Sequence, residues 1–134
     1  DESDSKEIGE QGELAVVAFE EGEDRTAERL EDTRPNHPGW DIVSVDGDEV
    51  RYIEVKTTTG TWGSRGVGLT EMQFREAQRR GDEYWLYVVE NLDSPDEVIH
   101  MIQNPVGRLS RMQFNGDWRA FAETGNRPRP EGLS

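Results

Sequence analysis

Apolar residues recur at helical spacing near the start of the chain. Leu14, Val17 and Ala18 fall on one face of a helix and predict that residues 9–20 are helical. The absence of proline before Pro35 leaves room for a further helical turn over residues 25–30.

A second helix is predicted from its end signals. Thr70 and Gln73 have the spacing of a capping box, and Gly81 provides a C-terminal cap, so residues 70–80 should be helical. Pro105 opens a shorter helical segment.

Runs rich in β-branched and aromatic residues predict four strands. Asp-Gly-Asp-Glu between the first two is a hairpin signal. Residues 57–68, rich in Gly and Thr, follow the second strand as a mobile loop. The predicted strands cover residues 41–45, 50–57, 84–90 and 97–102.

The order of these elements predicts an α/β fold, with a mixed central β-sheet flanked by helices on both faces. We divide the chain into an acidic tail or linker (1–8), one domain (9–115) and a peripheral C-terminal extension (116–134). The chain has 134 residues, no cysteine and no Met at its start, so we expect a disulfide-free domain from a longer protein.

The charge is strongly acidic, with a formal net charge of −14. Thirteen of the 15 basic residues are Arg, and only Lys6 and Lys56 are Lys. This composition favours a cytoplasmic protein of a salt-loving (halophilic) organism, where salt screens surface repulsion; a genome rich in G and C is the alternative. No apolar run is long enough for a membrane span, and we find no secretory signal.

Such acidity argues against nucleic-acid binding, because phosphate contacts dominate that affinity. The acidic excess is greatest in residues 1–34, however, so Arg clusters farther along the chain leave room for a phosphate-facing patch.

Three residues carry the candidate chemistry. Asp41 opens one predicted strand, while Glu54 and Lys56 lie two positions apart on the next and therefore share a face. Two carboxylates, with the Val55 carbonyl as a further ligand, suit Mg²⁺ or Mn²⁺. Lys56 has a compact ammonium able to orient a water or steady negative charge. An exposed strand face is the alternative for Glu54 and Lys56.

Asp41 followed by Glu54-Val55-Lys56 resembles the PD-(D/E)XK nuclease superfamily, although Trp40 stands where the name motif has Pro. The ordered segments GEQGELAV, HPGWDIVS, YIEVKTTTG, LTEMQFREA, YWLYVVEN and IQNP are similar to the C-terminal domain of the plant protein NO VEIN. Archaeal Holliday-junction resolvases and Mrr-type restriction nucleases share this core. The resemblance implies a restriction-endonuclease-like αβββαβ core, in which Asp41 and Glu54 bind the metal and Lys56 assists catalysis.

The same resemblance implies a carboxylate on the first helix facing the metal, for which Glu13 is the first choice and Glu10 the second. An ordinary exposed helix residue is the alternative for Glu13.

Five residues are candidate DNA contacts, each with a plainer alternative. Arg65 lies in the Gly-rich loop, and Arg75 and Arg79 lie on the second helix, where an Arg-rich solvent face is the alternative. Gln73 lies near the expected cleft but also suits a helix cap, and His37 is equally well a surface loop residue. Trp40 and Trp62 suit base stacking or core packing, and we expect His100 to be structural.

We therefore expect a Mg²⁺-dependent deoxyribonuclease domain that acts on DNA. Other domains or subunits of a restriction-modification or antiviral defence system would supply target recognition, and a homodimer is possible. The alternatives are a non-cleaving nucleic-acid-binding or protein-docking module on the same fold, and a Holliday junction resolvase.

Overall fold

The computed structural model describes residues 2–30, 38–63, 67–111 and 122–128. The helical elements are α1 (Glu2–Gly22), α2 (Glu71–Arg80) and the 3₁₀ segments η1 (Gly81–Glu83) and η2 (Val106–Arg111). The strands are β1 (Thr26–Arg29), β2 (Ile42–Asp46), β3 (Glu49–Thr57), β4 (Tyr84–Glu90), β5 (Val98–Gln103) and β6 (Glu123–Gly125).

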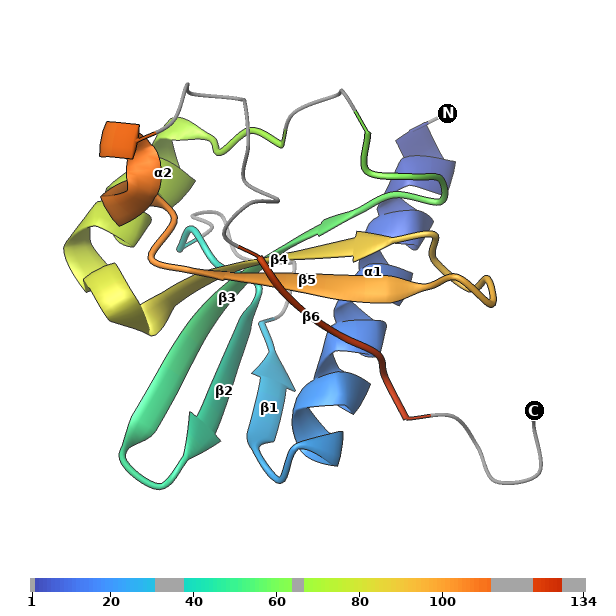
Figure 1. Cartoon of the computed structure of the whole chain (residues 1–134), viewed down its shortest axis with the longest axis horizontal. Helices are drawn as coiled ribbons and strands as arrows, with labels where there is room; N and C mark the ends of the chain where they lie inside the picture. Colours follow the sequence, from blue (N-terminus) through green and yellow to red (C-terminus); the bar gives the residue numbers. More distant parts are fainter. Residues whose placement is uncertain (1, 31–37, 64–66, 112–121, 129–134) are drawn as a thin grey trace.

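The strands form one six-stranded sheet in the order β1-β2-β3-β4-β5-β6. β3 and β4 are parallel and are connected through α2, whereas the other neighbouring pairs are antiparallel. The predicted mixed sheet and its α/β class are therefore confirmed, and the run from α1 to β4 has the expected αβββαβ order (Figure 1).

Each face of the sheet has its own apolar cluster. Val16 and Phe19 of α1 pack against Ile53 and Val55 of β3 on one face. On the other face, Trp62 belongs to a second cluster with Leu86, Val88 and Ile102. Alternate residues of β3 and β4 serve the two faces, as the period of a strand requires, so Glu54 and Lys56 lie on the face opposite α1.

The capping box of α2 is confirmed. Thr70 Oγ1 accepts a hydrogen bond from Gln73 N–H (3.2 Å), while Gln73 Oε1 accepts one from Thr70 N–H (2.9 Å). At the other end, Gly81 has φ +57° and donates its N–H to the Ala77 carbonyl. These three hydrogen bonds satisfy backbone groups at the two ends of the helix.

The helical turn predicted over residues 25–30 is wrong, because Thr26–Arg29 forms β1 and pairs with β2. Ala27 and Arg29 are half-buried, whereas Thr26 and Glu28 are exposed, so the segment has a period of two. Ala, Glu and Arg all favour helices in isolation, and pairing with β2 overrides that preference.

Both ends of the predicted domain carry more structure than expected. α1 begins at Glu2 rather than at residue 9, so the acidic stretch is helical, and β6 in the C-terminal extension pairs with β5. Acidic residues in the first turn of a helix interact favourably with its dipole. In the described part of the chain, no helix has the length and apolar character needed to cross a bilayer.

The close approach of α1 to β3 leads to a prediction about two glycines of the same helix. A Cβ added at Gly12 would overlap the Thr57 side chain, whereas one added at Gly9 meets no atom within 4 Å. We expect Gly12→Ala to lower the free energy of unfolding by about 1–3 kcal/mol through overpacking.

Gly9→Ala is the matched control, and we expect it to leave stability unchanged or to raise it by about 0.5–1 kcal/mol through better helix propensity. Urea unfolding of the two variants makes the comparison. Equal effects of the two substitutions would show that α1 is not held closely against β3.

Candidate active site

The site lies where β2 begins, beside β3. Asp41 N–H donates to the Ile53 carbonyl (2.8 Å), continuing the ladder one residue beyond Ile42. Val55 N–H then donates to Asp41 Oδ2 (2.8 Å), so a carboxylate takes the place of the next backbone acceptor. Because N–H and C=O of one strand residue project toward the same edge, the Val55 carbonyl also points to the side of Asp41.

Glu54 brings a second carboxylate to the same place. Its side chain is 5% exposed, and Glu54 Oε2 lies 3.7 Å from Lys56 Nζ. Burial raises the pKa of Glu54 well above its usual range, and the nearby Asp41 carboxylate raises the pKa further, while Lys56 opposes both effects. Glu54 Oε1 is buried and has no hydrogen-bond partner.

This arrangement fits a divalent cation with oxygen ligands. A buried carboxylate oxygen without a partner calls for an explanation such as an ion, and a cation beside Asp41 and Glu54 would relieve their repulsion. The described residues contain no group of three His, Cys, Asp or Glu side chains placed to hold a metal. Mg²⁺ needs no such group, because it commonly binds through one or two carboxylates and keeps several waters.

Glu13, the predicted carboxylate of α1, lies close enough to Glu54 to raise its pKa slightly. Glu13 Oε1 also accepts a hydrogen bond from Arg29 Nε (3.1 Å) of β1. Glu13 therefore pairs with Arg29 and completes no three-carboxylate metal cluster among the described residues. Sequence reasoning missed this partner, because residues 25–30 were predicted to be helical.

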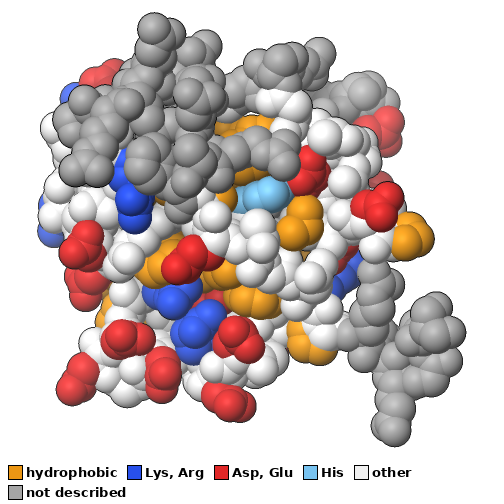
Figure 2. Space-filling model, viewed as in Figure 1, with side chains coloured by type: hydrophobic (Ala, Val, Ile, Leu, Met, Phe, Trp, Pro, Cys, Tyr) orange, Lys and Arg blue, Asp and Glu red, His pale blue; other side chains and the backbone are white. Residues whose placement is uncertain are grey.

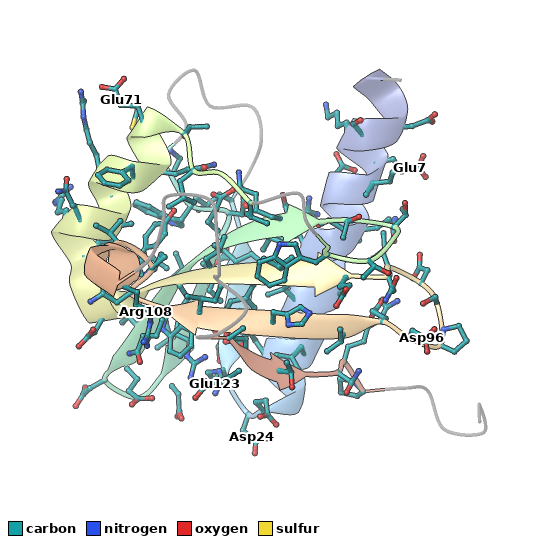
Figure 3. All side chains as sticks on the ribbon, turned by 45° about the horizontal axis from the view of Figure 1, so that its top comes forward. Glu7, Asp24, Glu71, Asp96, Arg108 and Glu123 are labelled. Atoms are coloured by element: carbon teal, nitrogen blue, oxygen red, sulfur yellow. The ribbon has the colours of Figure 1, made fainter. Side chains whose placement is uncertain are left out.

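The first turn of α2 borders the site. Lys56 Nζ donates to Gln73 Oε1 (3.2 Å), which connects β3 to the first turn of α2. Figure 3 shows Glu71 at the N-terminal end of α2. The partial positive charge of a helix N-terminus favours anions, which suits a site for a phosphate group.

Aromatic side chains pack around Gly39 and Trp40, the two residues that precede Asp41. The Trp40 ring lies edge-on to Tyr52, with centroids 5.0 Å apart, and the Arg80 guanidinium lies over both rings. Tyr84 OH donates to the Gly39 carbonyl (2.7 Å). Trp40 thus packs against neighbouring side chains in this structure, which matches the plainer of its two predicted roles.

A buried Glu-His pair anchors the loop after β3. Glu90 Oε1 lies 2.7 Å from His100 Nε2, and Glu90 Oε2 accepts a hydrogen bond from Trp62 N–H (2.7 Å). The Trp62 ring packs against His100 and is 5% exposed, so it presents no open surface to a base. The sequence predicted a structural role for His100 but no role for Glu90. A carboxylate at the end of an otherwise apolar, buried strand could have pointed to Glu90.

Most basic side chains in the described part of the chain are already paired with carboxylates, and Figure 2 shows blue side chains lying beside red ones. Arg75 and Arg79, two predicted DNA contacts, pair with Glu71 and Glu76 of their own helix. The ion pairs are Arg25–Glu20, Arg29–Glu13, Lys56–Glu54, Arg75–Glu71, Arg79–Glu76, Arg80–Glu76, and Arg127 with Asp93 and Glu97.

The other predicted DNA contacts divide into two groups. His37 and Arg65 lie outside the described residues. Gln73 is 9% exposed, and its Oε1 is shared by Lys56 and the cap of α2. A direct contact between DNA and any of these three residues stays a prediction.

The raised pKa of Glu54 predicts how the metal-free protein responds to pH. The folded state holds the Glu54 proton more tightly than the unfolded chain, whose Glu pKa is about 4.3. The Glu54 contribution to stability therefore falls as the pH rises above that value toward the folded-state pKa. At neutral pH we expect Glu54→Gln to raise the thermal midpoint of the metal-free protein by a few degrees.

Thermal melts of the wild type and Glu54→Gln between pH 4 and pH 8, with a chelator present, measure the difference. Glu71→Gln, which changes an exposed carboxylate, is the control. A stability difference between the wild type and Glu54→Gln that does not grow with pH would contradict the raised pKa.

Comparison with known proteins identifies the family and the fold of the chain. The family described as the C-terminal region of protein NO VEIN matches residues 11–102. The structure is similar to that of Hjc, a Holliday junction resolvase from the archaeal hyperthermophile Archaeoglobus fulgidus, with a TM-score of 0.56, 19% identity and 88% of each chain covered. A search of curated proteins finds no match. The chain belongs to the NO VEIN C-terminal family and has the PD-(D/E)XK nuclease fold.

Proposed function

We propose that this chain is a DNA endonuclease domain that depends on Mg²⁺ or Mn²⁺ and hydrolyses phosphodiester bonds. The observation that carries the proposal is the convergence of Asp41, Glu54 and Lys56 at the end of β3, with Glu54 Oε1 buried and without a hydrogen-bond partner. The match to the NO VEIN C-terminal family and the resolvase-like fold support it.

Each residue has a proposed part in the reaction. Asp41, Glu54 and the Val55 carbonyl would hold the cation, and Glu13 would support it through water. A divalent cation supplies polarisation of the phosphodiester and lowers the pKa of a water. Lys56, whose side chain is 29% exposed, would orient the attacking water or donate a hydrogen bond to the phosphate as negative charge develops.

The paired surface charges bear on how DNA reaches this site. Exposed ion pairs such as Arg75–Glu71 leave little net positive charge for phosphates. We therefore propose that other domains or subunits supply the main phosphate contacts and the choice of target. A restriction or antiviral defence protein in the cytoplasm of a halophile is one setting in which these features would occur together.

A second candidate function, junction resolution, rests on the structural similarity to Hjc. It predicts a homodimer and faster cleavage of a four-way junction than of a linear duplex with the same sequence. A non-cleaving DNA-binding or docking module is the remaining alternative, and it predicts no nicking with either metal.

Substitution of the site residues tests the proposal by plasmid nicking in Mg²⁺ or Mn²⁺ at high salt. We expect Lys56→Ala to slow nicking by about 10²–10⁴-fold, the usual contribution of a positioned proton donor or acceptor. Asp41→Asn should slow nicking at least as much, because it removes a metal ligand. Lys6→Ala, which replaces the only other lysine on an exposed turn of α1, should have no effect.

Nicking that survives both Asp41→Asn and Lys56→Ala would place the activity elsewhere. Absence of nicking by the wild-type protein, on supercoiled plasmid and on a four-way junction alike, would favour the non-cleaving module. Size-exclusion chromatography of the same preparation distinguishes the dimer expected of a resolvase from a monomer.

A further inference from the structure

We propose that Gln73 is a positioning residue that fixes the direction of the Lys56 ammonium, in addition to capping α2. The inference rests on the proposed function, since it concerns the same site, and it gives a role to a residue otherwise explained by its helix cap. Gln73 does not need to touch DNA to act in this way.

One oxygen atom of Gln73 both caps α2 and contacts Lys56. Gln73 Oε1 accepts hydrogen bonds from Thr70 N–H (2.9 Å) and from Lys56 Nζ (3.2 Å). Gln73 is 9% exposed, so its side chain has little freedom to leave. The backbone contact with Thr70 holds the amide in place, and the fixed amide then holds the lysine.

One hydrogen bond and one ion pair restrain the orientation of the Lys56 ammonium group. Lys56 Nζ has three N–H donors in tetrahedral directions. Gln73 Oε1 accepts one donor, and Glu54 Oε2, at 3.7 Å, attracts another. The hydrogen bond and the ion pair restrain the ammonium beside an open cavity of about 370 Å³ that Lys56 lines together with Thr58 and Thr61. Lysine otherwise has a flexible four-carbon stem, so this restraint places the donor before substrate arrives.

The choice of Gln over Glu has a physical reason. A capping box accepts either residue, but Glu at position 73 would add a third carboxylate near Asp41 and Glu54. It would also compete with Glu54 for Lys56. The neutral amide supplies an oxygen for Lys56 without adding negative charge to the site.

Thr70 allows the cap and the positioning role to be separated. Thr70→Ala removes Oγ1, which caps Gln73 N–H, but keeps the backbone N–H that holds Gln73 Oε1. Gln73→Met keeps a side chain of similar length but loses the oxygen that Lys56 needs. Both variants weaken the start of α2, and only Gln73→Met releases Lys56.

NMR of metal-free protein labelled with ¹³C at lysine Cε gives a readout that does not need cleavage. The chain has two lysines, so Lys6, on an exposed turn of α1, serves as an internal reference. We expect the order parameter of Lys56 to exceed that of Lys6 in the wild type and in Thr70→Ala. It should fall toward that of Lys6 in Gln73→Met, and Gln73→Glu, which restores the acceptor oxygen, should restore it.

Kinetics with plasmid DNA and metal provide the second readout. We expect Gln73→Met to lower kcat by about 10–100-fold with KM nearly unchanged, while Thr70→Ala leaves kcat within about twofold of wild type. Equal kcat values for the two variants, unchanged Lys56 order in Gln73→Met, or failure of Gln73→Glu to restore that order would overturn the inference. If the wild type does not cut DNA, the proposed function fails, and the NMR comparison still decides the role of Gln73.

Discussion

The hydrogen bond from Val55 N–H to the Asp41 carboxylate is the contact on which the site depends. It forms because β2 begins only at Ile42, opposite Ile53, so the Val55 N–H two residues further along β3 has no backbone acceptor on β2. A buried backbone donor needs an acceptor, so the sheet itself draws Asp41 toward Glu54. Two carboxylates are thereby held together against their repulsion, and the raised pKa of Glu54 reflects first its burial and then this repulsion.

Two helices and the loop after β3 pack around the strand that carries Glu54 and Lys56. α1 approaches β3 closely because Gly12 leaves room for the Thr57 side chain, and α2 reaches Lys56 through Gln73. On the other side of Lys56, the Glu90–His100 pair anchors the loop at Trp62. The frame is therefore organised before a metal or DNA binds, as a site that relies on electrostatic preorganisation requires.

Local sequence signals predicted those parts of the fold that short-range physics determines. The Thr70–Gln73 cap and the buried strand Tyr84–Glu90 depend on neighbouring residues, and the structure has both. β1 and β6 could not be predicted in this way, because Thr26–Arg29 and Glu123–Gly125 become strands only through pairing with strands that are distant in the sequence. In the site, the sequence predicted that Asp41, Glu54 and Lys56 lie close together. Glu54 and Lys56 are two positions apart on one strand, and a hairpin brings Asp41 beside them. The contacts of Glu13 with Arg29 and of Gln73 with Lys56 require tertiary structure.

The claim that Asp41, Glu54 and the Val55 carbonyl form a divalent-cation site can be tested directly by anomalous diffraction from crystals grown with Mn²⁺. We predict an anomalous peak within coordination distance of Asp41, Glu54 and the Val55 carbonyl oxygen, with waters completing the shell. Crystals of Asp41→Asn grown in the same way should lack the peak. A wild-type map with no manganese between the two carboxylates, at a concentration that supports nicking, would contradict the proposed site.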